Sequence, residues 1–410
     1  MNCIILSVGD ELITGKTVDT NSAWLAGRMV ELGVEPLAHE TVGDDIDTVA
    51  DGMARAAARA EVVLVTGGLG PTADDLTRQA LAKAMGGAEL VLDPPSLETI
   101  AEFFRRRGRE MAPANRIQAM FPAGSTVLPN AVGTAPGMTA RVGTSDVFVM
   151  PGVPHEMKWV FEHEVRPRLS LPRRTIRTHI VHTFGRGESD VGQMIADLMT
   201  RGQSTTVGTT VCSGMVSVRL IIRSETAEQA QTEEQRLVAE LRRRLGDLVV
   251  GEGEDTMASV AGRLLHRKGQ TLATAESCTG GLLGSLITAV AGSSEYYLGG
   301  AVSYANAAKQ TLLGVDSELL ERHGAVSEPV AAAMAEGCRH RLAADWAIAI
   351  TGIAGPGGDS EEKPVGLVYT ALAGPAGTTV TRHLFPGNRE HIRERAAMAA
   401  LNELRLAMGG

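Results

Sequence analysis

Short apolar runs that stop at glycine-rich turns, each followed by a segment with helical spacing, constrain the fold of this chain more than any other feature. In the first part of the chain such runs are residues 3–8, 61–65 and 146–150. Helical spacing follows at 22–32 and 72–85, and Asp74 and Asp75 are expected in the first turn of the second helix, where the helix dipole favours acids. Alternation of strand, glycine turn and helix is typical of a parallel sheet with crossover helices. We therefore predict an α/β domain here.

The pattern changes near residues 171–174, which have the composition of a linker. Residues 175–250 then predict a small α+β module in the order strand, helix (188–199), two strands (205–212 and 215–223), helix (227–245) and strand. After a polar linker at 251–255 the α/β alternation returns, with the helices 257–268, 282–290 and 391–408 and the strands 271–274 and 346–350. We predict three domains, α/β (1–170), α+β (171–252) and α/β (256–410).

Charge and composition exclude several classes of function. A net charge of −9 and only seven Phe, three Trp and four Tyr argue against a nucleic-acid-binding role, and the basic runs 105–109 and 242–244 are interpreted as solvated helix faces. Four scattered cysteines without C-x-x-C spacing fit a reducing cytosol and no structural zinc. No apolar stretch is long enough to span a membrane and no signal peptide is visible, so we expect a cytoplasmic protein.

In the last domain, Ser277 lies in a glycine-rich turn between a strand and a helix, where free backbone N–H groups stabilise an oxyanion or bind a phosphate. Tyr304 and Lys309 follow downstream, and a serine paired with a lysine is a nucleophile when burial lowers the lysine pKa. Alternatively, Ser277 only caps a helix and Lys309 is solvated, or the neighbouring Cys278 is the nucleophile. Tyr304 and Lys309 are five residues apart rather than four, and no G-x-G-x-x-G opens this domain, so hydride transfer is disfavoured.

Acidic residues gather in loops of the first domain. Their carboxylate oxygens are suitable ligands for a Mg²⁺ ion that bridges a diphosphate. The glycines of 67–70 would let the backbone approach the phosphates of that diphosphate. These acids are Asp10, Asp44, Asp74, Asp75 and Glu156. Alternatively, Asp74 and Asp75 only complete helix caps and Glu156 only opens the helix after Pro154. Each acid alone favours this structural explanation, whereas their clustering at several strand ends favours a site. The sequence T-G-x-x-G-P occurs at 66–71 and again at 351–356, either by chance or because both turns present backbone N–H groups to a phosphate or ribose.

Specific motifs extend over nearly the whole chain. They are the segments 9–12, 66–72 with 74–77, 133–137, 151–157, 184–189, 274–281, 304–309, 325–328, 351–356 and 366–369. With these segments the chain resembles the bacterial CinA family of competence/damage-inducible proteins. The resemblance implies a molybdopterin-binding fold in the first domain, a KH-type middle module and a nicotinamide-nucleotide amidase domain at the end.

The resemblance further implies hydrolysis of nicotinamide mononucleotide to nicotinic acid mononucleotide and ammonia in pyridine nucleotide salvage, without a cofactor. Ser277 would be the nucleophile, Lys309 its base and Tyr304 an assisting residue. Substrate would be held by Thr279, Gly280, Gly281, Ser294, Thr351, Gly352, Arg389 and Arg393. The choice between Arg389 and Arg393 stays open, as does that between Ser293 and Ser294 for the phosphate.

For the first domain the resemblance implies an ADP-ribose pyrophosphatase activity that requires a divalent metal (Mg, Mn or Co) held by the five acids above. The nucleotide would lie against Gly9, Gly67, Gly68, Gly70, Thr72 and Gly137. A homodimer is also expected. The alternatives are a non-catalytic pterin- or nucleotide-binding protein and a nucleic-acid-associated competence factor, of which the net charge disfavours the second.

Overall fold

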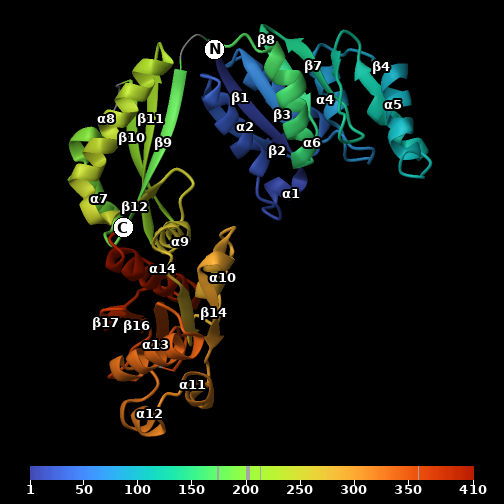
Figure 1. Cartoon of the computed structure of the whole chain (residues 1–410). Coiled ribbons are helices and arrows are strands. Elements are labelled where there is room, and N and C mark those ends of the chain that lie inside the picture. Colours follow the sequence, from blue (N-terminus) through green and yellow to red (C-terminus); the bar gives the residue numbers. More distant parts are fainter. Residues whose placement is uncertain (173–174, 200–203, 213, 359) are drawn as a thin grey trace. The chain divides into compact units, whose positions relative to one another are not determined.

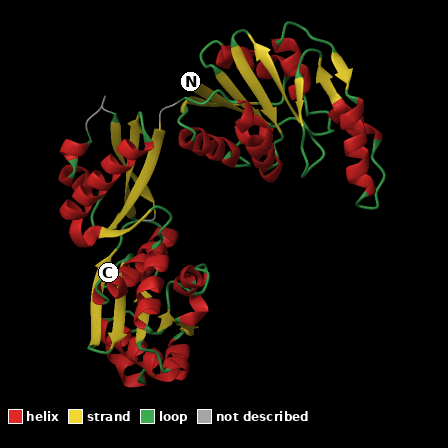
Figure 2. Cartoon of the chain, turned by 45° about the horizontal axis from the view of Figure 1, so that its top comes forward, coloured by secondary structure: helices red, strands yellow, loops and turns green. Residues whose placement is uncertain are grey.

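A computed structural model describes residues 1–172, 175–199, 204–212, 214–358 and 360–410, so Arg173 and Arg174 of the first predicted linker lie outside the described residues. The chain folds into two compact units, Met1–Arg177 with Arg223–Gln231, and Thr178–Ile222 with Thr232–Gly410 (Figures 1 and 2).

The first unit contains a six-stranded sheet in the order β2-β1-β3-β8-β7-β6. Four neighbouring strands, β2, β1, β3 and β8, are parallel, which confirms the parallel sheet predicted from the runs that form β1, β3 and β8. Strand β2 and the antiparallel edge of β7 and β6 were not predicted from the sequence. The strands are β1 (Asn2–Val8), β2 (Glu35–Val42), β3 (Val62–Thr66), β6 (Thr126–Leu128), β7 (Gly137–Val142) and β8 (Ser145–Met150), with a separate ribbon of β4 (Leu90–Leu92) and β5 (Met120–Pro122).

Helices cover both faces of this sheet, which explains why β3 is an uninterrupted apolar run. Val63 and Val65 of β3 belong to one core with α3 and α4, and Leu64 belongs to the other core with α2 and α6. The helices are α1 (Asp10–Ile13), α2 (Thr20–Glu31), α3 (Ile46–Ala57), α4 (Thr77–Ala84), α5 (Pro94–Arg105) and α6 (Pro154–Val160), with the short turns η1 (Pro113–Ala119), η2 (Phe161–Val165) and η3 (Arg166–Arg168).

Helix α4 begins at Thr77 rather than at residue 72, so the prediction that Asp74 and Asp75 lie in its first turn is wrong. The Asp75 carboxylate accepts hydrogen bonds from the backbone N–H groups of Gly70 (2.6 Å) and Thr72 (2.8 Å) and from the Thr72 hydroxyl. This local side-chain-to-backbone bonding competes with helix formation and holds the segment as a turn.

The middle module, most of which belongs to the second unit, has a four-stranded sheet in the order β10-β11-β9-β12 with two main helices, the α+β arrangement predicted from the sequence. Its strands are β9 (Thr175–Phe184), β10 (Thr205–Cys212), β11 (Met215–Ser224) and β12 (Val249–Glu252), and its helices are α7 (Glu188–Met194), η4 (Ala196–Leu198), α8 (Ala227–Leu245) and η5 (Gly246–Leu248).

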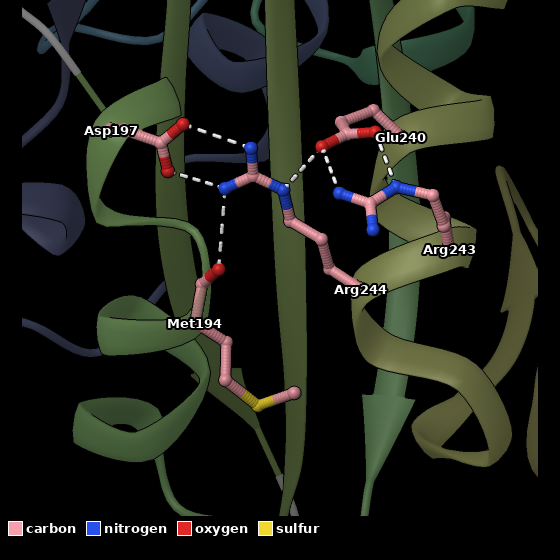
Figure 3. Close-up of polar contacts among 5 residues, drawn as sticks. All are labelled: Met194, Asp197, Glu240, Arg243 and Arg244. Carbon is pink, nitrogen blue, oxygen red and sulfur yellow. Dashed lines mark hydrogen bonds and ion pairs between the residues drawn. The ribbon is translucent and has the colours of Figure 1, made fainter.

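The arginine run at the end of α8 is engaged in ion pairs within this module, as Figure 3 shows for two of its members. Arg244 contacts Asp197 and Glu240, and Arg243 lies 2.7 Å from Glu240. The third member, Arg242, lies 2.6 Å from Glu252. The basic charge of the run is therefore locally balanced by carboxylates.

The C-terminal domain is a five-stranded sheet in the order β14-β13-β15-β16-β17, in which β14, β13 and β15 are parallel and β16 and β17 add an antiparallel hairpin. The strands are β13 (Leu272–Glu276), β14 (Tyr297–Val302), β15 (Trp346–Gly352), β16 (Leu367–Gly374) and β17 (Gly377–Leu384). The helices are α9 (Met257–Lys268), α10 (Leu282–Thr288), η6 (Ser293–Glu295), α11 (Asn306–Leu313), α12 (Ser317–His323), α13 (Glu328–Leu342) and α14 (Arg389–Ala407).

Alternate residues of β15 enter different cores, with Ile348 and Ile350 packing with α9, α10 and α14, and Ala347 and Ala349 packing with α13. The sheet is therefore covered on both faces. No helix among the described residues is both long enough and apolar enough to cross a membrane.

A buried arginine of α14 ties the middle module to the C-terminal domain within the second unit. Arg405 is 1% exposed and donates to the carbonyls of Asp247 (2.6 Å) and Val249 (3.1 Å). Val250 of β12 belongs to the same apolar core as Met257, and apolar and polar contacts together thus hold these two parts in a defined arrangement.

Candidate functional site

The turn that carries Ser277 follows β13 at the carboxyl edge of the C-terminal sheet, where ligands bind in open α/β folds. The Ser277 N–H donates to the carbonyl of Ile350 on the neighbouring strand (2.9 Å), and the Ser277 side chain is 8% exposed. Gly280 (φ 60°) and Gly281 (φ 95°) adopt the left-handed conformation that reverses the chain before α10. The turn is thus fixed by the sheet on one side and the helix on the other.

Glu276, whose role the sequence did not reveal, caps the start of α10. Its buried carboxylate accepts backbone hydrogen bonds from Gly281 (3.0 Å), Leu283 (3.0 Å) and Gly284 (2.8 Å). These N–H groups have no partner within the helix, and a carboxylate there also complements the helix dipole. The acid next to Ser277 therefore positions the turn.

Lys309 extends from α11 to the Ser277 hydroxyl and is 1% exposed. Its Nζ lies 3.0 Å from Ser277 Oγ, 2.8 Å from the Ser303 carbonyl and 3.2 Å from the Tyr304 carbonyl. Burial lowers the pKa of this amine from 10.5, because a charged ammonium loses water that the two carbonyls replace only in part. Ser277 and Lys309 are brought together as predicted from the sequence.

The two carbonyls determine what a neutral Lys309 can do. A carbonyl only accepts, so two N–H groups of the amine point to Ser303 and Tyr304. The lone pair of the amine then faces Ser277 Oγ, the geometry in which a base takes a hydroxyl proton. An amine placed in this way can activate a serine without a histidine.

Cys278, the alternative nucleophile, is buried, and burial raises the pKa of its thiol to about 11. A thiol with such a pKa is protonated at neutral pH and is a poor nucleophile. The geometry favours Ser277 over Cys278.

Tyr304 is 60% exposed and contacts Lys309 through its carbonyl rather than its hydroxyl. The hydroxyl accepts instead from Arg389 (3.0 Å), which also donates to the Gly355 carbonyl (2.6 Å). Arg393 donates to the Thr279 carbonyl (2.6 Å) in the Ser277 turn. Both candidate arginines thus reach loops of this edge.

Thr351 and Gly352 end β15 at the same edge, and the Thr351 hydroxyl donates to the Ala325 carbonyl (2.8 Å). The Thr279 hydroxyl is fully buried and has no hydrogen-bond partner among the described residues. Ser294, by contrast, lies just before β14. The first residue of β14, Tyr297, pairs with the first residue of the parallel strand β13, Leu272, whereas Ser277 follows the last residue of β13. Ser294 is therefore at the opposite edge of the sheet from Ser277. Within one chain, Ser294 therefore lies away from the other residues that were predicted to bind substrate near Ser277.

Glycines of the first domain gather at the carboxyl edge of its parallel strands. Gly9 follows β1, and Gly67 (φ 110°) and Gly68 (φ 65°) follow β3. A Cβ on Gly67 would lie 2.2 Å from the Val8 carbonyl, so the two strand ends approach each other only because this residue is glycine. Gly70 and Thr72 are bonded to Asp75, and Gly137 is packed against the Val149 carbonyl inside the sheet.

The predicted acidic residues divide into three groups, with Asp74 placed in the first because its charge acts on Asp44. Asp10 and Asp44 bond to each other's backbone N–H groups, and burial together with the nearby charges of Asp10, Glu11 and Asp74 raises the pKa of Asp44. Asp75 is committed to the turn. Glu156 accepts from the Asn130 amide (2.5 Å). No three acidic, histidine or cysteine side chains of the described residues are placed to hold a metal ion, so the carboxylates that the described chain brings together do not by themselves form a metal site.

Sequence reasoning missed a buried cation beneath the glycine turn. Arg78 is 0% exposed, and its guanidinium donates to the carbonyls of Leu69 (2.7 Å) and Gly70 (3.4 Å). Burial lowers its pKa to about 10, and its Nε has no partner among the described residues. Its position in a helix next to Thr77 gave no signal of this role.

The two T-G-x-x-G-P turns differ in conformation. In the first, Gly67 and Gly68 have positive φ; in the second, only Gly355 does, and the Gly355–Pro356 peptide is cis. The repeat is one of sequence and location at a strand end, and not of backbone geometry.

The fold and the sites define a modular protein of three parts: an α/β domain, a four-stranded α+β module, and an α/β domain with a buried serine–lysine pair at its strand ends. Comparison with known families matches residues 4–171 to "Probable molybdopterin binding domain", 178–251 to "Damage-inducible protein CinA KH domain" and 254–408 to "CinA C-terminal domain". The chain belongs to the CinA family.

Similar relatives span the full chain. A CinA-like protein of Geobacter sulfurreducens is 44% identical over 99% of this chain and 98% of its own length. A CinA-like protein of Parasynechococcus marenigrum is 43% identical over 98% and 97%. A solved structure of CinA from Thermoplasma acidophilum, described as of unknown function, is 31% identical, covers 41% of this chain and 98% of its own, and has a TM-score of 0.38.

Proposed function

We propose that the C-terminal domain is an amidohydrolase that converts nicotinamide mononucleotide into nicotinic acid mononucleotide and ammonia. The observation that carries the proposal is Lys309 Nζ at 3.0 Å from Ser277 Oγ, with its other two contacts made by carbonyls. The choice of substrate rests on the family to which the chain belongs.

In the proposed reaction neutral Lys309 takes the Ser277 hydroxyl proton as Oγ attacks the carboxamide carbon. The ammonium form of Lys309 then protonates the amide nitrogen, which leaves as ammonia and leaves an ester on Ser277. Water attacks this ester while Lys309 again accepts a proton, and that proton returns to Ser277 Oγ as the acid departs. Every proton moves through one amine, so no cofactor is needed.

The test measures ammonia released from nicotinamide mononucleotide by the full chain. Ser277→Ala is expected to abolish release, and Cys278→Ala to retain it, because the Cys278 thiol is buried and protonated. Activity that survives Ser277→Ala and disappears in Cys278→Ala would refute the assignment of the nucleophile.

A second activity, a divalent-metal ADP-ribose pyrophosphatase, is proposed for the first domain. It is supported by the family to which the chain belongs and by the glycine turns at the carboxyl edge of the sheet, and its metal would need ligands beyond the carboxylates that the described residues bring together. Cleavage of ADP-ribose would be measured with Mg²⁺, Mn²⁺ or Co²⁺ and after chelation. Saturable binding of ADP-ribose or molybdopterin without cleavage under every metal would instead establish the non-catalytic alternative.

We also propose that the protein acts in the cytoplasm as a homodimer on small nucleotides rather than on nucleic acid. Light scattering that gives the mass of one chain would contradict the dimer. Salt-sensitive binding to duplex DNA would contradict the choice of ligand.

A further inference from the structure

A cleft of about 510 Å³ lies between the middle module and α14 of the C-terminal domain, away from Ser277. Its volume is in the range of pockets that bind small molecules. Its walls are held in place, because Arg405 on α14 bonds to Asp247 and Val249 of the middle module. The residues that matter for recognition are Arg186, Glu188, His383, Phe385, Arg395 and Glu403.

The charged groups of the cleft differ in whether they have hydrogen-bond partners within the protein. Glu188 accepts from the Thr209 hydroxyl (2.8 Å), and Glu403 accepts from Thr370 (2.8 Å) and lies 3.1 Å from His383 Nε2. The side chains of Arg186 and Arg395 have no hydrogen-bond or ion-pair partner among the described residues. The two guanidinium groups are therefore the charged groups of the cleft without a partner in the described chain, and guanidinium groups match phosphate oxygens in geometry as well as in charge.

The cleft also offers a flat aromatic surface. The rings of His383 and Phe385 on β17 and the following loop are stacked, with centroids 4.9 Å apart and planes 13° apart. Thr370 and Glu403 fix the His383 ring through its Nε2 atom. Two stacked rings with restricted orientation form a platform for another planar ring.

From these observations we infer that the cleft binds a nucleoside monophosphate, with the phosphate on Arg395 and Arg186 and the base against the His383–Phe385 pair. The site is distinct from both proposed catalytic sites. It does not depend on the amidase reaction, and its test uses binding alone.

The test is calorimetric titration of AMP into the full chain and three variants. Arg395→Gln is expected to weaken binding about tenfold or more by removing a phosphate partner, and Phe385→Leu to weaken it several-fold by removing a ring. Arg382→Gln is the matched control, because Arg382 is an exposed arginine of β17 outside the cleft. Its affinity for AMP should equal that of the native chain.

Inorganic phosphate serves as the second probe, and its binding should be weaker than that of AMP, sensitive to Arg395→Gln and insensitive to Phe385→Leu. Photo-crosslinking with 8-azido-AMP followed by peptide mapping should label the region of β17 and α14 even if a variant folds poorly. The inference is overturned if AMP does not saturate the native chain, if Arg395→Gln binds AMP with native affinity, if phosphate binds as tightly as AMP, or if labelling falls elsewhere.

Discussion

Replacing Lys309 by Met tests the proposed role of the amine most directly, because Met has a similar length and no base. A positioned general base contributes roughly 10²–10⁴ in rate. At about 1.36 kcal/mol per factor of ten, the activation barrier for ammonia release should rise by about 3–5 kcal/mol. The folded state should tolerate the change, because the cost of two unpaired carbonyls, about 1–3 kcal/mol each, is offset by removal of a buried amine.

The pH dependence of the native chain provides a second readout. Only neutral Lys309 accepts a proton, so the rate should rise with pH through a pKa below 10.5. Because the folded pKa lies below the unfolded one, the unfolded chain binds more protons between the two values. The native chain should therefore gain stability relative to Lys309→Met as pH rises through that window.

Ammonia release and urea unfolding should be measured for Lys309→Met beside Lys363→Met. Lys363 also donates to a carbonyl, that of His323, but it does not contact Ser277, and its variant should keep native activity. The reasoning is refuted if Lys309→Met retains more than about a tenth of the native rate, or if the native rate does not change with pH below 10.5.

Four further outcomes are expected. Glu276→Gln should lower the free energy of unfolding by about 2–4 kcal/mol in urea titrations, because an amide cannot accept all three backbone N–H bonds. Arg78→Met should lower the free energy of unfolding by a similar amount, about 2–4 kcal/mol. Arg78→Lys should not restore this stability, because one ammonium cannot replace the guanidinium that donates to both Leu69 and Gly70. Cys278 should resist alkylation at neutral pH and react only as pH approaches about 11, measured by mass spectrometry with exposed Cys212 as the internal comparison. Asp44→Asn should be more stable than the native chain at pH values above the raised Asp44 pKa, and this difference should disappear as pH falls through that pKa. The reason is that the folded state binds the Asp44 proton more tightly than the unfolded state does. Equal pH profiles of melting temperature for the two proteins would contradict this expectation.

Elements whose signals are local were predictable from the sequence. Helix α9 begins and ends where its spacing predicted, with Thr256 as its cap and Gly269 in the left-handed conformation after it. Strand β3 was recognisable because both of its faces are buried. Pairings between distant segments were not predictable in this way, and the antiparallel hairpin of β16 and β17 was missed because strand order depends on contacts that no short window contains.

The serine–lysine pair was predicted correctly as a pair, but its surroundings were not. Nothing in the sequence distinguishes the carbonyl of Ser303 from any other carbonyl, although it makes the shortest contact of Lys309. The start of α4 was misplaced because Asp75 bonds to the turn before it, a choice between two local structures that composition alone does not decide.

The two carbonyls around Lys309 mean that the main chain, and not a side chain, orients its amine. A comparison of side-chain identities at positions 303 and 304 would therefore underrate both residues, since many amino acids supply the same acceptor. Transplanting this chemistry into another scaffold requires copying the peptide path from the end of β14 to the start of α11. Replacing a single backbone amide by an ester there would perturb the lysine more selectively than exchanging the Tyr304 side chain.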